Sequence, residues 1–221
     1  FNAIGFQGEQ VVLGWLVLEL TDSPMLVGTA LALRMAPFLL IGLPAGAIAD
    51  RVNRRDFLFK LTFGMSALTF VLCALTLMGF LSIWNLLLIT FLGGFLRAMH
   101  QPARQSFAYD IVGQANLISG LSFLALSMRI GGIVGSLTTG LLIGYVGYHA
   151  AYGFLAISYI CSVIALLAIT KVTHIRVESS QGILDNLREL FSEIRRNSPF
   201  RALLVLSAGV EILGFSHQAI L

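Results

Sequence analysis

The chain has 221 residues, of which 57% are hydrophobic and only 11% are charged. Soluble globular domains use about 45–50% apolar and about 25% charged residues, so this composition excludes a water-soluble fold. The net charge is +3, but the 14 Lys and Arg and the 11 Asp and Glu lie in short segments between apolar runs. They form no basic face, and nucleic-acid binding is therefore excluded as well.

Two long stretches, residues 61–96 and 130–170, contain no Asp, Glu, Lys or Arg. Each is nearly twice the roughly 20 residues that a helix needs to cross a bilayer, so each should hold two membrane-spanning helices. Pro24, at a first helical position with Asp22 or Ser23 as the cap, marks the start of another span. We predict six spans from these signals, at about residues 5–18, 24–49, 57–78, 83–104, 117–143 and 150–170.

The predicted organisation has three parts: a six-helix membrane bundle over residues 1–170, a polar linker over 171–199, and a seventh apolar segment over 200–221. Apolar residues between Ile183 and Ile194 recur at helical spacing and predict an amphipathic helix on the membrane surface. That helix is either a plain connection or a regulatory, lipid-sensing element. The sequence starts without Met and stops inside an apolar run, so we expect a fragment of a longer protein.

The distribution of Lys and Arg predicts the orientation in the membrane. These residues lie between the second and third spans, at the end of the fourth span, and after the sixth, whereas the loops at 21–23, 79–82 and 144–149 have none. Positive loops stay on the cytoplasmic side, so the N-terminus should be cytoplasmic in an integral protein of a bacterial inner (cell) membrane. Trp84 and Tyr145 would belong to an aromatic belt at the opposite surface.

An internal repeat is indicated by the second and fifth spans. Each carries an arginine near its middle, Arg34 and Arg129, and small residues follow each arginine. The two spans correspond if the first six form two repeats of three helices, as transporters often do.

The most specific segment is residues 42–55, which contains Gly46, Asp50, Arg51, Arg54 and Arg55. It resembles the loop signature of the major facilitator superfamily, with an asparagine at position 53 where the family usually has a glycine. Asparagine also tolerates a left-handed backbone. The resemblance implies a cytoplasmic gate, in which the aspartate faces a cation or a helix N-terminus and the basic pair binds carboxylates or helix C-termini.

Other segments extend the resemblance over nearly the whole chain. Residues 129–135 are similar to the glycine-rich fifth helix of superfamily exporters. Residues 101–105 with Asp110, 112–116 and 197–203 look like the branch of enterobactin-type siderophore exporters and macrolide efflux proteins. The resemblance implies an all-α polytopic membrane protein of twelve spans in two bundles. This chain would be the first bundle, a 3+3 inverted repeat, plus the start of the seventh helix, and its partner would be the C-terminal six-helix bundle.

Charged residues inside the membrane are costly and mark candidate functional positions. Glu9 is the single acid well inside the predicted spans, and it could carry a proton or neutralise Arg34 or Arg129 in a structural ion pair. Those two arginines could serve packing or line a cavity. Arg97 is similar in its helix to a coupling arginine of drug and proton antiporters, although its surroundings differ from that motif.

The leading functional prediction is a secondary active transporter that exports a small amphipathic molecule, of drug or siderophore type, in exchange for protons. Uptake by proton symport on the same fold is the alternative, because the gate signature does not set direction. A seven-helix receptor conflicts with a cytoplasmic N-terminus. No catalytic constellation and no metal-ligand spacing is present, so we expect no enzyme activity and no cofactor, with the small-molecule substrate, protons and the lipid bilayer as partners.

Overall fold

The computed structural model describes residues 1–169 and residues 197, 199, 201, 202, 206 and 209, and of residues 43, 44 and 46–51 it describes the backbone only. The chain divides into two units, residues 1–176 and 177–221, and the first carries the described helices. The predicted linker helix and the predicted seventh segment fall on residues that are outside this description or only sparsely covered by it.

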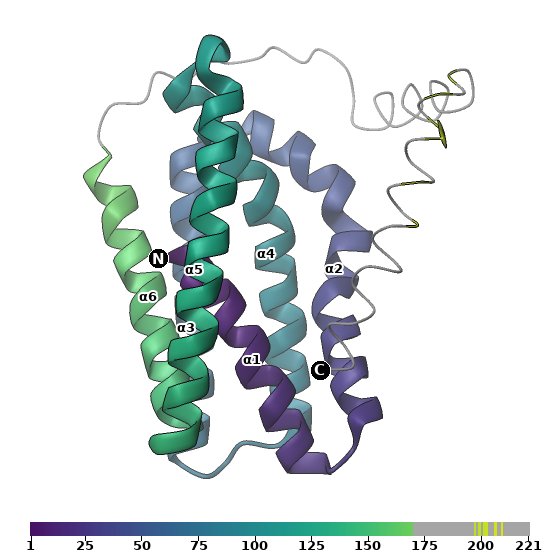
Figure 1. The fold of residues 1–221 in the computed structure, drawn as a ribbon, viewed down its shortest axis with the longest axis vertical. Helices are drawn as coiled ribbons and strands as arrows, with labels where there is room; N and C mark the ends of the chain where they lie inside the picture. The colour runs from purple at the N-terminus through teal and green to yellow at the C-terminus, as the bar shows by residue number, and fades with distance from the viewer. Residues whose placement is uncertain (170–196, 198, 200, 203–205, 207–208, 210–221) are drawn as a thin grey trace. The chain divides into compact units, whose positions relative to one another are not determined.

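The first unit is built of long α-helices, with no strand among the described residues. The helices are α1 (Asn2–Thr21), α2 (Pro24–Arg51), α3 (Arg54–Leu77), α4 (Ile83–Val112), α5 (Leu117–Tyr145) and α6 (Tyr148–Ala168), with a short 3-10 helix, η1 (Gln114–Asn116), before α5. They run roughly side by side (Figure 1). Each predicted span corresponds to one helix, which confirms the all-α fold class.

Within the described part of the chain, five helices, α2 to α6, are long and apolar enough to cross a membrane. The helix α1 is not one of them, although its 20 residues match the length of a span. Its first half carries Asn2, Gln7, Glu9 and Gln10, which lower its hydropathy. These polar residues are tolerated because α1 packs against α2, α4, α5 and α6 instead of standing alone in lipid.

Several helix ends follow the predicted signals, and some differ. Ser23 is the N-cap of α2, with Pro24 at its start, but the Ser23 side chain makes no capping hydrogen bond. Asn53 does not use the left-handed backbone that asparagine tolerates, since its φ is −62°. Its side chain instead accepts a hydrogen bond from the backbone N–H of Asp56 and caps α3. The helix α4, which contains Pro102, continues past the predicted end at residue 104 to Val112.

The packing of the helices has the symmetry of a repeat. The most extensive contacts join α2 to α4, α1 to α5, and α3 to α6. Exchanging α1 with α4, α2 with α5 and α3 with α6 maps this set of pairs onto itself. The contacts are therefore those expected of two three-helix repeats, as predicted from the arginines in α2 and α5.

Glycines allow α1 and α5 to approach closely. A Cβ atom added to Gly8 would lie 2.6 Å from Thr139 Oγ1, and one added to Gly131 would lie 2.5 Å from Ala3 Cβ. In α4, a Cβ on Gly94 would lie 2.6 Å from the backbone oxygen of Arg34 in α2. Small residues at such crossings stabilise membrane helices because the backbones gain van der Waals contact.

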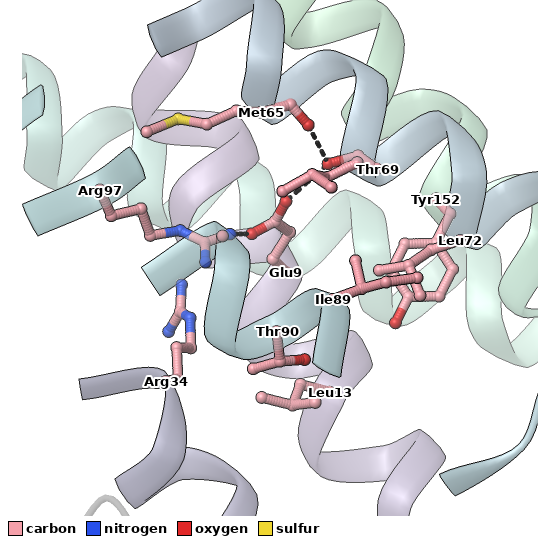
Figure 2. Close-up of a pocket in the computed structure, with 12 residues that line it drawn as sticks. Glu9, Leu13, Arg34, Met65, Thr69, Leu72, Ile89, Thr90, Arg97 and Tyr152 are labelled. Carbon is pink, nitrogen blue, oxygen red and sulfur yellow. Dashed lines mark hydrogen bonds and ion pairs between the residues drawn. The ribbon is translucent and has the colours of Figure 1, made fainter. Parts of the chain in front are cut away.

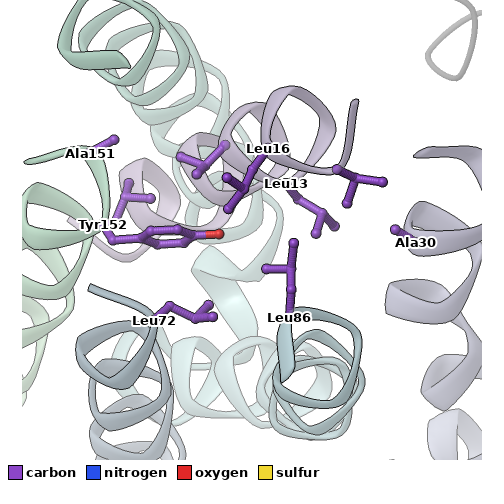
Figure 3. Close-up of a cluster of buried hydrophobic side chains, with 10 residues drawn as sticks. Leu13, Leu16, Ala30, Leu72, Leu86, Ala151 and Tyr152 are labelled. Carbon is purple, nitrogen blue, oxygen red and sulfur yellow. The ribbon is translucent and has the colours of Figure 1, made fainter. Parts of the chain in front are cut away.

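Two apolar clusters fill the two halves of the bundle. The larger one lies toward the end formed by the α1–α2, α3–α4 and α5–α6 connections and includes Leu13, Leu16, Leu72, Leu86 and Tyr152 (Figure 3). The smaller one is at the opposite end and is formed by Leu58, Ala103 and Phe107. A layer of charged and polar side chains separates the two clusters, and it contains the candidate site.

Candidate functional site

Glu9 of α1 forms a buried ion pair with Arg97 of α4 (Figure 2). The side chains of Glu9 and Arg97 are 11% and 5% exposed. Thr69 of α3 donates a hydrogen bond to Glu9 Oε1 over 2.7 Å, and its hydroxyl also lies 2.9 Å from the backbone oxygen of Met65. A hydroxyl has one hydrogen to donate, so the Thr69 bond to Glu9 competes with the bond to its own helix.

Arg34 of α2 reaches into the same layer. Its Nη2 atom donates to the backbone oxygen of Phe6 over 2.7 Å, and its Nη1 atom donates to Gln10 Oε1 over 3.3 Å. Both arginines also lie over the Phe6 ring, with Cζ at 4.9 Å from the ring centroid for Arg34 and 5.7 Å for Arg97. Figure 2 shows the two guanidinium groups extending toward each other from α2 and α4.

We call Glu9, Thr69, Arg34 and Arg97 the central charge cluster. It borders a small cavity of about 20 Å³, which is room for about one or two water molecules. Leu13, Thr90 and Tyr152 complete much of its wall. A whole substrate molecule does not fit in this space, whereas a water or one small polar group does.

The structure brings three of the four predicted membrane charges together and separates the fourth. We expected Glu9 to pair with Arg34 or Arg129, but its ion pair is with Arg97. Arg34 lines the same cavity. Arg129 is exposed on α5. The neighbouring Gly131 and Gly132 occupy the side of α5 that packs against α1, so Arg129 lies away from this cluster.

A second group of charges lies at the end of the bundle where α3 begins and α4 and α6 end. Arg54 Nη1 donates to Asp110 Oδ1 over 2.5 Å and lies 3.3 Å from the backbone oxygen of Ser106. The Asp110 side chain is fully buried. Arg55 donates to the backbone oxygens of Leu166 and Leu167, over 3.2 and 3.0 Å, at the C-terminal end of α6.

We call Arg54, Arg55 and Asp110 the loop-end cluster. The contacts are of the two kinds that the motif implied for the basic pair, a carboxylate for Arg54 and a helix C-terminus for Arg55, and a role in a gate stays a prediction. The remaining motif residues are described only in part. Gly46, Asp50 and Arg51 belong to the helix α2, but their side chains are outside the described residues.

The sequence reasoning missed Thr69, Phe6 and Gln10. Thr69 is one of several threonines in an apolar span and gives no signal of its own. A signal did exist for the other two, because Phe6, Glu9 and Gln10 are spaced three and four residues apart and so share one face of α1. A partner of Arg34 could have been sought on that face.

Comparison with known proteins agrees with this geometry. The profile of a family described as transmembrane secretion effector matches residues 1–220. The chain belongs to this family of the major facilitator superfamily. The family consists of membrane transporters, which agrees with the apolar helices and with the prediction that the protein is not an enzyme.

A curated relative of this family member is the staphyloferrin A transporter of Staphylococcus aureus (strain NCTC 8325 / PS 47). The two are 29% identical over 218 residues, which cover 96% of this chain and 53% of the relative. The chain therefore spans about half the length of the relative it matches. The similarity supports the superfamily, and the narrower resemblance to enterobactin exporters and macrolide efflux proteins stays a prediction.

Proposed function

We propose that the full-length protein is a secondary active transporter that exports a small amphipathic molecule in exchange for protons, by alternating access. Residues 1–170 would form its N-terminal six-helix bundle, residues 171–199 the linker, and residues 200–221 the start of the C-terminal bundle. Since the cavity within the first bundle holds only one or two waters, a substrate needs a wider site between the two bundles.

The observation that carries the proposal is the buried ion pair of Glu9 and Arg97 beside a cavity. Glu9 is the single acid among the described residues that line this cavity. Protonation of Glu9 would remove its charge, break the ion pair and allow Thr69 to donate to Met65 instead. The two protonation states would then favour different contacts between α1, α3 and α4, and this difference is what a coupled conformational change requires.

Two observations support export as the direction of transport. The matched family is described as a transmembrane secretion effector, and α5 is rich in glycine, like the fifth helix of the superfamily exporters that the sequence resembles.

We propose further that the protein lies in the bacterial inner membrane with its N-terminus cytoplasmic, because the basic residues gather at the end of the bundle that holds Arg54 and Arg55. Cysteines at Asn53 and Ser82 should be labelled from the cytoplasm and from outside, respectively, and the reverse labelling would overturn the orientation.

The test of proton coupling is Glu9→Gln in the full-length transporter, reconstituted in vesicles. If Glu9 carries the proton, substrate-driven proton movement should vanish while counterflow of substrate down its own gradient survives. Glu19→Gln is the matched control, because Glu19 is on the same helix but exposed near its end, where it accepts a hydrogen bond from the Tyr148 hydroxyl. This control should keep proton-coupled transport.

A purely structural ion pair predicts a different result for the same variant. Glu9→Gln would leave Arg97 buried without its carboxylate, at a cost of about 3–5 kcal/mol. Yield, thermal stability and every transport mode would then fall together. Normal proton-coupled transport by the variant would exclude Glu9 as the carrier.

A further inference from the structure

The central charge cluster contains more positive than negative charge. Arg34 and Arg97 both border the cavity, and Glu9 is the single acid among its described lining residues. Arginine stays protonated in proteins, so the cluster has one surplus positive charge when Glu9 is ionised and two when Glu9 is protonated. Carbonyl and amide oxygens, which are the hydrogen-bond partners of Arg34, reduce the cost of this charge but do not neutralise it.

Unused hydrogen-bond donors accompany the surplus charge. Arg97 Nε is buried and has no hydrogen-bond partner among the described residues. Arg34 donates two of its five N–H groups, to Phe6 and Gln10, among the described residues. The adjoining cavity of about 20 Å³ has the size of one small group rather than of a whole substrate molecule.

We propose that the cavity between Arg34 and Arg97 binds a small anionic group, and that this anion binds together with a proton on Glu9. The inference rests on the proposed function in taking Glu9 as the group that accepts the proton. The coupling has a simple cause: an anion in the cavity and the Glu9 carboxylate compete for the same Arg97 guanidinium. Protonation of Glu9 withdraws the competitor and strengthens anion binding, and a bound anion favours protonation to the same degree.

The anion can come from two sources, which have different consequences for the transport cycle. A chloride ion would accompany the proton and lower the surplus positive charge of the cluster from two to one during the step in which the exporter returns without substrate. A carboxylate of the transported molecule would instead bring substrate and proton onto the protein together, as in the uptake symporter that the sequence left as an alternative. Both sources share one chemistry, a small anion between two guanidinium groups.

Several other groups set the proton affinity around Glu9. The helix α3 contributes Thr69, which does not titrate in the physiological range, and α5 contributes no described group to the cavity wall. Among the residues that line the cavity, the charged or titratable side chains beside Glu9 are Arg34 of α2, Arg97 of α4 and Tyr152 of α6. His100 of α4 and Tyr159 of α6 are buried within the bundle. The three lining side chains are buried as well. Variants at Glu9 and Arg34 therefore have to be compared with wild type under the same buffer conditions.

The experiment is calorimetric titration of the purified full-length transporter in detergent, in chloride-free zwitterionic buffer, with chloride and with acetate as the probes and acetamide as the neutral control. Buffers of different ionisation enthalpy give the number of protons taken up. We expect saturable binding of an anion with proton uptake, and no binding of acetamide. Arg34→Gln should weaken anion binding about 10- to 100-fold, since it removes charge-assisted hydrogen bonds. Lys60→Gln, which removes an exposed cation of α3, should leave binding unchanged.

Glu9→Gln should change the anion affinity in the opposite direction to Arg34→Gln. It therefore keeps the test decisive if Arg34→Gln does not fold. This variant removes the competing carboxylate, so it should bind the anion more tightly than wild type, by about tenfold or more, without taking up a proton. Binding of chloride would support an inorganic anion, and binding of acetate without chloride would support a carboxylate of the transported molecule. Absence of saturable binding, or binding that Glu9→Gln does not tighten, would overturn the proposal.

The titration needs no proton gradient and no transport. Failure of proton-coupled transport in vesicles would therefore overturn the proposed function while leaving anion binding in detergent to be judged by itself. Anion binding without proton uptake would overturn the coupled-binding claim.

Discussion

The two charge clusters of the bundle have the same formal charges, two arginines and one acid each, but they differ in where the second arginine lies. In the loop-end cluster, Arg54 faces the buried carboxylate of Asp110, and the half-buried Arg55 faces the carbonyl end of α6. In the central charge cluster, Arg97 pairs with Glu9, and Arg34 is almost fully buried beside the cavity, with neutral oxygens as its hydrogen-bond partners. Surplus charge is more costly at the buried site, so the central cluster should respond more strongly to a proton or an anion that reaches it. We propose that the loop-end cluster sets the rate of a conformational change and that the central cluster couples this change to an ion.

The largest effect on stability is expected from Arg97→Gln in the full-length protein. It leaves the buried Glu9 carboxylate with Thr69 as its described partner, and the free energy of unfolding should fall by about 3–5 kcal/mol. Adding Glu9→Gln to this variant should recover much of the loss, because neither the Glu9 carboxylate nor the Arg97 guanidinium is then left buried without the other. Denaturant unfolding in detergent of the two single variants and the double variant measures this coupling. Strictly additive losses would show that the two side chains do not depend on each other.

The next prediction concerns the loop-end cluster and transport rate. Asp110→Asn should lower the transport rate about 5- to 150-fold, the range of a conformational coupling of about 1–3 kcal/mol, without changing the number of protons moved per substrate. Asp50→Asn, at the motif aspartate predicted for the gate, should act in the same way. The exposed Asp56 of α3 provides the control Asp56→Asn, which should transport normally.

Vesicle assays that record proton and substrate flux together distinguish the two clusters. A changed proton-to-substrate ratio in Asp110→Asn, at an unchanged rate, would contradict the division of roles.

The smallest effect is expected at Arg129. It corresponds to Arg34 in the predicted repeat, but Arg129 is exposed on α5 whereas Arg34 is 1% exposed. Arg129→Gln should therefore change the stability of the full-length protein by no more than about 0.5 kcal/mol. Arg34→Gln, which removes a buried and hydrogen-bonded guanidinium, should cost several times as much. Equal losses in thermal unfolding would show that Arg129 is held by contacts in the full-length protein.

The fold was largely predictable because the signals that define it are local. Apolar runs, the proline at position 24 and the glycine-containing turns depend on neighbouring residues, and the six observed helices match the six predicted spans. The end of α4 was missed because Arg104 suggested a loop, although the helix continues by packing Ala103 and Phe107 against Leu58. Burial of an amphipathic helix end is a tertiary effect that a hydropathy signal does not contain.

The candidate site was predictable in its members but not in its pairings. Glu9, Arg34, Arg97 and Arg129 stand out because charge is costly in a membrane. Which arginine meets Glu9 depends on the rotation of α1 against α4, and that rotation is set by close contacts such as that of Gly8 with Thr139 on the side of α1 that faces α5. The loop-end cluster was easier to foresee, since the motif implies two types of partner for the basic pair, although it does not say which arginine takes which partner.

The central claim is that Glu9 exchanges its ion pair with Arg97 for a proton. Infrared difference spectra of the full-length transporter, recorded between mildly alkaline and mildly acidic buffer, measure this exchange through the C=O stretch of a protonated carboxyl group. The account predicts a band that appears on acidification, persists in Glu19→Gln and is missing in Glu9→Gln. A Glu9→Gln spectrum identical to that of the wild type would contradict it.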